Sequence, residues 1–317
     1  MARCFVTRRL PGPAVSLLQE AHEVEIWEGR LPPTPAELSE KAAGAEGLLT
    51  LLTDRIDAAL IDSSPRLRAI SNYAVGVDNV DIEAATRGGI PVGNTPDVLT
   101  HATADLTFAL LLAAARKLPD AIEAASEGDW VTWEPAMHLG REVHGATLGI
   151  IGFGRIGRAV AARAEGFEMR VLRTGRDQPI DPLLYEADFV SLHAPLTPAT
   201  HHLIDAHALS KMRPNAILIN TARGGLVDQV ALEHALEQGS IAGAALDVTD
   251  PEPLPPDDPL LRAPNLILTP HIGSATQAAR ERMAELAVEN LLAGLEGLPM
   301  PHQVNALSRG AELRRAN

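Results

Sequence analysis

Residues Leu148–Gly157 read LGIIGFGRIG, an apolar run that meets three glycines in a G-x-G-x-x-G spacing. The run is typical of a buried strand, and the amphipathic pattern of Arg158–Ala164 is typical of a helix that follows directly. In such a unit Gly152 permits the sharp turn, Gly154 lets the backbone approach a pyrophosphate, and Gly157 lets the helix pack on the strand. Free N–H groups at the helix N-terminus then attract the phosphate charge. The stretch therefore predicts a dinucleotide-binding unit.

Strand and helix patterns alternate on both sides of this unit, which indicates parallel sheets. Helices are predicted at 14–21, at 103–117 and after a Thr34 cap. A length of 317 residues exceeds one typical core and suits about two domains. We therefore expect an α/β protein with two Rossmann-like, doubly wound parallel-sheet domains and a cleft between them. Its predicted strands lie at 4–7, 24–27, 47–52, 67–71, 147–151, 168–173, 188–193, 216–220, 241–248 and 266–269.

Composition excludes several classes of protein. The net charge of −14 argues against a nucleic-acid or acidic-membrane partner, since either needs a basic face, and we attribute it to solubility. The single cysteine, Cys4, rules out a disulfide framework or a Cys-rich metal site, and we expect no metal. The start of the chain has no apolar signal core, and no apolar run is long enough to span a membrane. A cytoplasmic enzyme is the resulting expectation.

Three ionisable residues follow three successive predicted strands at their carboxyl ends. Arg223 follows strand 216–220, and Glu252 and His271 follow the next two strands. Alone, they read as a surface arginine, a turn residue between prolines and a helix-entry residue. Together they lie along the edge where doubly wound sheets bind ligands. The sequence therefore predicts a site at this edge.

Hydride transfer to a 2-keto acid requires this set of side chains. An arginine holds the substrate carboxylate through two parallel donors. A histidine protonates the carbonyl oxygen as hydride arrives at the carbon. A carboxylate behind the histidine fixes its tautomer and favours its protonated form. A nicotinamide supplies the redox chemistry.

Residues Asn72–Asn79, NYAVGVDN, form a second candidate binding segment because they follow a predicted strand and contain Gly76. A loop beyond a strand end can present backbone N–H groups to a carboxylate. The alternative is an ordinary turn between a strand and a helix.

These motifs together resemble the D-2-hydroxyacid dehydrogenase family, and most of all its glyoxylate/hydroxypyruvate reductase branch. The resemblance implies that His271 is the acid/base, that Glu252 supports it and that Arg223 binds the substrate carboxylate. The matching stretches touch most of the chain: Asn72–Asp81, Gly93–Asp105, Gly128–Pro135, Thr147–Val160, Asn220–Asp228, Gly243–Pro253 and Pro270–Ala275.

The resemblance also implies the remaining contacts of the site. Val75 and Gly76 would contact the carboxylate through their backbone, the loop that begins at Leu51 would close over the substrate, and Asp247 would face the nicotinamide carboxamide. The full set expected to bind the cofactor is Thr103, Gly152, Gly154, Arg155, Ile156, Gly157, Arg173, Thr174, Arg176, His193, Pro195, Thr221, Asp247 and Gly273.

The family further implies a split domain order and a dimer. Residues 1–97 and 285–317 would form the substrate domain, with the nucleotide domain, 98–284, inserted between them. Members are typically dimers built through the nucleotide domain, so Trp133 would reach the partner's pocket. The sequence departs from this branch of the family at two places. His101 stands where the branch usually has an acidic residue, and the segment 176–184 is shorter than in the family, which affects the adenine side of the site.

The predicted cofactor is NADP(H), with use of NAD(H) as well as the alternative. NAD enzymes of this fold carry an acidic residue about 20 residues past the glycines, where it binds the ribose hydroxyls. By alignment with the family, Gly175 occupies that position, and Asp177 comes after the turn, where we expect it to face solvent. Arg173 and Arg176 lie nearby to attract a 2′-phosphate, and Thr174 adds a hydroxyl donor.

Two other functions are compatible with this reading. A 3-phosphoglycerate dehydrogenase shares the three catalytic residues, and short forms without a regulatory domain exist. A dinucleotide-sensing scaffold of the corepressor type shares the fold but needs an exposed peptide-docking surface. The intact set of Arg223, Glu252 and His271 favours catalysis of keto-acid reduction.

Overall fold

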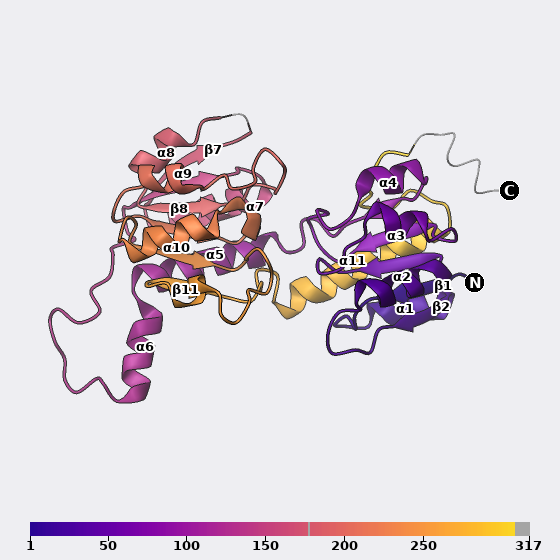
Figure 1. Ribbon diagram of the computed structural model, residues 1–317, viewed down its shortest axis with the longest axis horizontal. Coiled ribbons are helices and arrows are strands. Elements are labelled where there is room, and N and C mark those ends of the chain that lie inside the picture. The colour runs from indigo at the N-terminus through magenta and orange to yellow at the C-terminus, as the bar shows by residue number, and fades with distance from the viewer. Residues whose placement is uncertain (177, 308–317) are drawn as a thin grey trace. The chain divides into compact units, whose positions relative to one another are not determined.

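The computed structural model describes residues 1–176 and 178–307, so Asp177 lies outside the described residues. The chain forms two compact units (Figure 1). Unit 1 contains Met1–Leu99 and the segment that begins at Ala275, and unit 2 contains Thr100–Ser274. The expected boundary at 285 falls inside helix α11 (Gln277–Leu295), which belongs to unit 1 over its whole length.

Unit 2 is a six-stranded parallel sheet in the order β11-β10-β9-β8-β6-β7. The chain enters at β6, adds β7 on one side and then crosses to β8 on the other, so the direction of winding reverses between β6 and β8. Ligands of such sheets bind at the carboxyl ends of the strands next to this reversal. The strands are β6 (Thr147–Ile151), β7 (Arg170–Thr174), β8 (Phe189–Leu192), β9 (Ile217–Asn220), β10 (Gly243–Leu246) and β11 (Leu266–Leu268).

Helices cover both faces of this sheet. Its strands β6, β8, β9 and β10 are therefore buried over their whole lengths and read as continuous apolar runs. Side chains of α5 and α7 pack in one core, and side chains of α8, α9 and α10 pack in the other. The helices are α5 (Thr100–Ala115), α6 (Leu118–Glu127), α7 (Arg155–Glu165), α8 (Asp181–Glu186), α9 (Ala206–Lys211) and α10 (Gln229–Glu237), with short 3-10 turns η1 (Gly224–Leu226) and η2 (Pro259–Arg262).

Unit 1 is a five-stranded parallel sheet in the order β2-β1-β3-β4-β5. Helices α1 and α11 pack on one face, and α2, α3 and α4 pack on the other. The elements are β1 (Arg3–Val6), α1 (Ala14–Ala21), β2 (Glu23–Ile26), α2 (Pro35–Gly44), β3 (Gly47–Thr50), α3 (Ala58–Asp62), β4 (Ala69–Asn72), α4 (Ile82–Arg87) and β5 (Val92–Gly93).

The two parallel α/β sheets confirm the predicted fold class. The Thr34 cap is also confirmed: Glu37 N–H donates to the Thr34 hydroxyl at 3.3 Å, and Thr34 N–H donates back to the Glu37 carboxylate at 2.8 Å. The strand predicted at 47–52 instead ends at Thr50, because Leu51 starts a turn that Asp54 closes. Cys4 lies fully buried in β1, and burial raises the pKa of its thiol to about 12.

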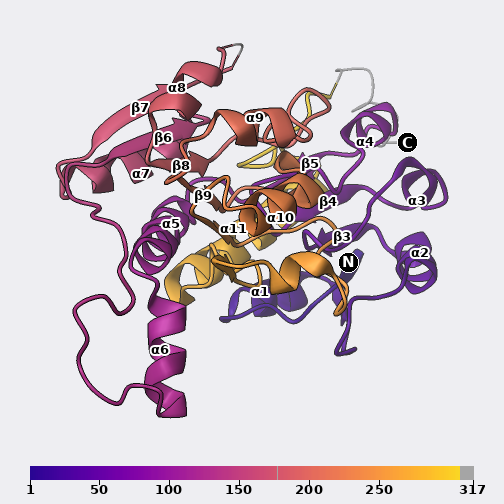
Figure 2. The ribbon, with the colours of Figure 1, turned by 60° about the vertical axis from the view of Figure 1, so that its left-hand side comes forward.

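Helix α6 and the segment that follows it extend away from the sheet of unit 2, as both views show (Figures 1 and 2). No side chain of α6 is buried. Trp130 and Trp133, in the segment after the helix, are 61% and 74% exposed. Exposed tryptophans grouped on one extension are typical of a surface that another chain covers. Among the described residues, no helix combines the length and apolar character needed to cross a membrane.

Candidate active site

Arg223, Glu252 and His271 lie at the carboxyl edge of the sheet in unit 2. Each follows one of three adjacent strands, since β9, β10 and β11 are neighbours in the sheet. Gly224 allows the segments after β9 and β10 to approach closely, because a Cβ atom there would lie 2.0 Å from the carbonyl carbon of Thr249. Any larger residue would separate Arg223 from the segment that carries Glu252.

The side chains of His271 and Glu252 are in direct contact, with 2.6 Å between His271 Nδ1 and Glu252 Oε1. Because an ionised carboxylate only accepts hydrogen bonds, this contact assigns a hydrogen to Nδ1. The second ring nitrogen, Nε2, is then the atom that can exchange a proton with a ligand. The imidazole and the carboxylate are 21% and 33% exposed, so both can be reached from solvent.

Asp247, at the end of β10, holds the turn on which His271 sits. His271 has φ 52°, a left-handed conformation that non-glycine residues seldom adopt. The Asp247 carboxylate accepts the N–H groups of Ile272 at 2.8 Å and Gly273 at 2.7 Å, and the Thr269 hydroxyl at 2.6 Å. The neighbouring strand end therefore stabilises this strained turn. The expected contact between Asp247 and a nicotinamide stays a prediction.

Arg223 is half-buried, and its chain is fixed through its backbone. Asn220, the last residue of β9, donates from Nδ2 to the Arg223 carbonyl at 2.8 Å and accepts the Ala222 N–H at 3.0 Å. The Arg223 guanidinium donates to the Ala222 carbonyl at 2.7 Å. These hydrogen bonds within residues 220–223 fix the backbone of the loop after β9, from which the Arg223 side chain extends.

The glycine turn between β6 and α7 has the features that a pyrophosphate requires. Gly152 has φ 94°, and a Cβ atom there would lie 2.5 Å from the Ala194 nitrogen, so only glycine fits. A Cβ at Gly157 would lie 2.3 Å from the Gly152 oxygen, which explains the tight packing of helix on strand. At Gly154 a Cβ would meet no atom within 4 Å, so the backbone faces open space at the start of α7. This cradle fits a dinucleotide phosphate.

Two further expected cofactor residues, Arg173 and Thr174, end strand β7. The Arg173 guanidinium carbon lies 4.7 Å from the centre of the Phe153 ring, which fixes the charge beside the glycine turn. The Thr174 hydroxyl is buried and has no hydrogen-bond partner among the described residues. Arg176 is exposed in the turn that follows. The described part of this segment, 170–176, contains no carboxylate.

The other expected cofactor residues lie on segments next to this edge. The Thr103 hydroxyl, on α5, donates to the Gly273 carbonyl at 3.2 Å, and the Thr221 hydroxyl lies 2.9 Å from that of Thr107 on the same helix. His193 follows β8, and its Nε2 lies 2.9 Å from the Ser191 hydroxyl. Burial lowers the pKa of His193 to about 4, so its ring is neutral near pH 7. Arg155 and Ile156 begin α7, and Pro195 lies in the segment after β8. Arg155 and Pro195 are exposed, and Ile156 is half-buried.

The expected substrate residues Leu51, Val75 and Gly76 belong to unit 1, where they follow the ends of β3 and β4. All three are half-buried. The sequence did not predict that Asn72 and Asn94 hold the segment with Val75 and Gly76, or that Thr269 contacts Asp247. One available signal was their position, because Asn72, Asn94 and Thr269 all come at or just past strand ends.

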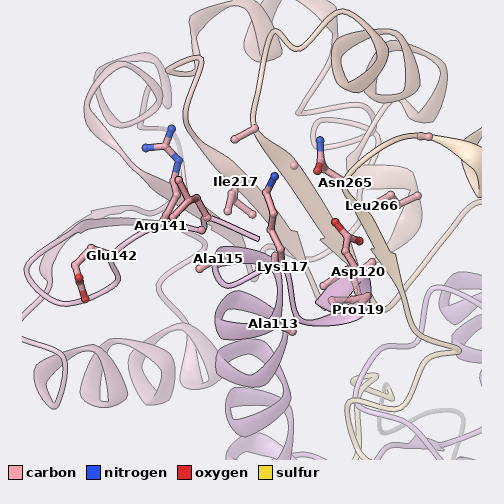
Figure 3. A pocket seen from close by; sticks show the side chains of 17 residues that line it. Ala113, Ala115, Lys117, Pro119, Asp120, Arg141, Glu142, Ile217, Asn265 and Leu266 are labelled. Carbon is pink, nitrogen blue, oxygen red and sulfur yellow. The ribbon is translucent and has the colours of Figure 1, made fainter. Parts of the chain in front are cut away.

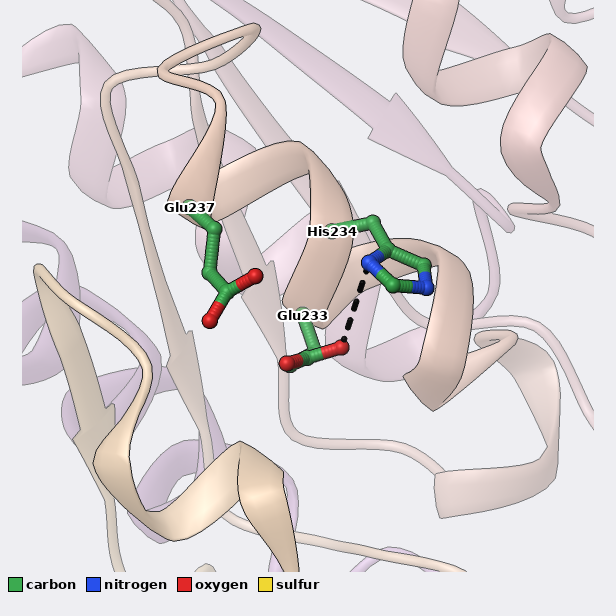
Figure 4. Close-up of side chains that lie close together, drawn as sticks. All are labelled: Glu233, His234 and Glu237. Atoms are coloured by element: carbon green, nitrogen blue, oxygen red, sulfur yellow. Dashed lines mark ion pairs between the residues drawn. The ribbon is translucent and has the colours of Figure 1, made fainter.

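Two other features of unit 2 lie outside this constellation. A pocket of about 640 Å³ is lined by the first residues of β9, β10 and β11 (Ile217, Gly243 and Leu266), which places it at the opposite edge of the sheet (Figure 3). Glu233, His234 and Glu237 group on α10 at metal-ligand spacing (Figure 4). His234 and Glu237 are exposed, and Glu233 already pairs with His234 at 3.5 Å.

The chain belongs to the D-isomer specific 2-hydroxyacid dehydrogenases, since residues 108–273 match the family's NAD binding domain and similar proteins cover nearly its full length. It is therefore an oxidoreductase that binds a nicotinamide dinucleotide, which confirms the predicted family and enzyme class. Glyoxylate reductases of Korarchaeum cryptofilum and Pyrococcus furiosus are 48% and 47% identical to it; each match covers 96% of this chain, and 96% and 95% of those proteins.

Solved structures agree with this assignment. A crystal structure of a Thermus thermophilus protein has a TM-score of 0.91 and 52% identity, and the match covers 96% of this chain and 100% of that one. An NADPH-dependent glyoxylate/hydroxypyruvate reductase of Sinorhizobium meliloti, solved with NADP and malonate, has a TM-score of 0.85 and 34% identity, with 96% of both chains covered.

Proposed function

We propose that the protein is a cytoplasmic reductase of small 2-keto acids, which converts glyoxylate to glycolate and hydroxypyruvate to D-glycerate. The observation that carries this proposal is the 2.6 Å contact between His271 and Glu252 at the sheet edge that also presents Arg223. The similar proteins of Korarchaeum and Pyrococcus are named glyoxylate reductases, which supports glyoxylate as a substrate. The name of the Sinorhizobium protein, a glyoxylate/hydroxypyruvate reductase, supports both substrates.

Each residue has one task in the proposed reaction. The reduced nicotinamide, when bound, supplies the hydride to the carbonyl carbon. Arg223 pairs with the substrate carboxylate and orients the keto group. His271 gives its Nε2 proton to the carbonyl oxygen, while Glu252 stabilises the charged ring through Nδ1. In this proposal unit 2 is the dinucleotide-binding domain, and unit 1 contributes Leu51 and the backbone of Val75 and Gly76 to the substrate.

The direct test is the loss of NAD(P)H absorbance with glyoxylate, hydroxypyruvate and phosphohydroxypyruvate, each measured in parallel. We expect turnover with the first two. A strong preference for phosphohydroxypyruvate would instead assign a 3-phosphoglycerate dehydrogenase. No turnover with any keto acid, despite cofactor binding, would favour a dinucleotide-sensing scaffold.

Changing Glu252 to glutamine is expected to move the pH dependence of reduction to lower pH. Reduction consumes a proton that His271 delivers to the carbonyl oxygen, so the rate falls as pH rises and the supply of protons decreases. Without an anionic partner the protonated ring is less stable, and the fall should begin at lower pH. The measurement is kcat/KM for glyoxylate against pH in parent and variant. Superimposable profiles would mean that Glu252 does not support His271.

We further infer that the enzyme prefers NADPH to NADH. Three features of β7 support this preference: no carboxylate in 170–176, the Arg173 guanidinium held beside Phe153, and the buried Thr174 hydroxyl without a partner. A carboxylate at this position would repel a 2′-phosphate, whereas arginines attract it. The NADP complex of the Sinorhizobium enzyme agrees with this choice.

Changing Arg176 to alanine should therefore reduce the preference for NADPH. Loss of one exposed cation from a phosphate site should lower kcat/KM with NADPH several-fold, about 1 kcal/mol, and leave NADH almost unaffected. Arg170→Ala is the matched control, because Arg170 starts the same strand and pairs with Glu186 at 2.8 Å. A parent enzyme that prefers NADH would refute the inference, as would an Arg176 variant with unchanged cofactor preference.

We also infer a homodimer through the nucleotide-binding unit. Helix α6 and the segment after it carry apolar side chains that their own unit leaves uncovered, with Ile122, Trp130 and Trp133 each more than half exposed. Burying such a surface against a second copy would remove it from water. In that arrangement Trp133 would reach the substrate pocket of the partner.

A further inference from the structure

The loop that follows β4 is held by its carbonyl groups. Three consecutive carbonyl oxygens accept hydrogen bonds from the protein: Ala74 from Thr95 N–H at 2.8 Å, Val75 from Asn94 Nδ2 at 2.7 Å, and Gly76 from Asn72 Nδ2 at 3.0 Å. Two of the three donors are asparagine side chains. Backbone carbonyls in a short loop are thus fixed by residues that end β4 and follow β5.

This arrangement determines where the N–H groups of the same peptide units point. In a planar trans peptide the N–H lies opposite the C=O. The N–H groups of Val75, Gly76 and Val77 are therefore turned away from the three donors. In the described part of the chain they donate to no protein acceptor. A short run of unpaired N–H groups is an anion-binding feature, which suits a carboxylate.

A third asparagine, Asn79, links this loop to the one that begins at Leu51. Asn79 donates from Nδ2 to the carbonyls of Leu51 at 3.0 Å and Asp54 at 2.9 Å. Asn72 donates to Asn79 Oδ1 at 3.0 Å, so the fully buried Asn72 amide contacts both loops through one network. The two segments expected to meet substrate are hence fixed relative to each other within unit 1.

We propose that Asn72 and Asn94 are positioning residues for the substrate carboxylate, because they hold the carbonyls of Gly76 and Val75 so that the adjoining N–H groups face the anion. Neither asparagine side chain touches the substrate. The inference rests on the proposed keto-acid reductase function, and it assigns these two amides a role in orienting substrate rather than cofactor.

The test compares Asn94→Ala with the parent and with Thr34→Ala. Thr34 caps α2 in the same unit, so its variant loses stability but leaves the loop intact. We expect Asn94→Ala to raise KM for glyoxylate about ten- to a hundredfold, the equivalent of one hydrogen bond to a charged group. The dissociation constant for NADPH, followed by its fluorescence, should not change. Thr34→Ala should keep the parent KM.

Amide hydrogen exchange supplies a readout that needs no catalysis. The N–H groups of Ala74 and Thr95, which are hydrogen-bonded to the Asn72 and Ala74 carbonyls, should exchange faster in Asn94→Ala than in Thr34→Ala, since only the former frees the loop. A parental KM together with unchanged exchange would overturn the proposal. Equal rises of KM in both variants would reduce Asn94 to a general contribution to stability, which also overturns it. If the parent enzyme reduces no keto acid, the proposed function fails by itself, and unchanged exchange would separately reject the loop-holding role.

Discussion

Replacing His271 with alanine is expected to lower kcat for glyoxylate reduction about 10²- to 10⁴-fold, the usual contribution of a positioned acid/base. The contact of Nδ1 with Glu252 orients the ring and leaves Nε2 to protonate the carbonyl oxygen. Without this donor, the alkoxide that forms as hydride arrives must take its proton from water. Steady-state kinetics should show the loss in kcat, and NADPH binding followed by fluorescence should be almost unchanged.

His234→Ala provides the matched control for this prediction. His234 lies on α10 in the same unit, with a side chain that is 62% exposed and outside the sheet edge. Its removal should leave kcat at the parent value. Near-parental turnover in the His271 variant would remove that residue from the mechanism. A large loss of NADPH affinity would indicate that the change damaged the turn held by Asp247 instead.

Arg223→Lys is expected to lower kcat/KM for glyoxylate by about ten- to a hundredfold, although the positive charge is kept. A lysine offers a single point of charge and loses one of the two parallel hydrogen bonds to a carboxylate, each of which contributes about 1.5–3 kcal/mol when a charge is involved. The contact of the guanidinium with the Ala222 carbonyl at 2.7 Å would also be lost, so orientation should suffer with affinity.

Arg213→Lys is a suitable comparison, because Arg213 lies in the same unit but follows helix α9 and pairs with Asp188 at 2.8 Å, away from the carboxyl edge of the sheet. That variant should retain parent kinetics. Glyoxylate reduction by Arg223→Lys at the parent kcat/KM would rule out the two-point contact. If the variant keeps kcat and raises only KM, Arg223 binds the carboxylate without orienting the keto group.

Local sequence patterns determined most of the fold. Apolar runs that alternate with helical patterns predicted ten of the eleven strands in the described residues to within a few positions, because a buried parallel strand must be apolar on both faces. The two-residue strand β5 (Val92–Gly93) was not predicted, since so short a segment has no distinct pattern. The glycines at 152, 154 and 157 predicted the turn into α7, since their conformations and close approaches exclude a Cβ at two of the three. The order of strands along the chain likewise brought Arg223, Glu252 and His271 to one edge.

The tertiary structure decided what fixes those residues. Asp247 accepts hydrogen bonds from the N–H groups of Ile272 and Gly273, which are distant from it in sequence, and no periodic pattern connects these residues. The same holds for Asn94 and the Val75 carbonyl, and for helix α11, which joins unit 1 from the far end of the chain. The spacing of apolar residues along a segment shows which of its faces packs against the core. Hydrogen bonds between neighbouring strand ends depend on side-chain positions in space, which only the folded sheet brings within reach of one another.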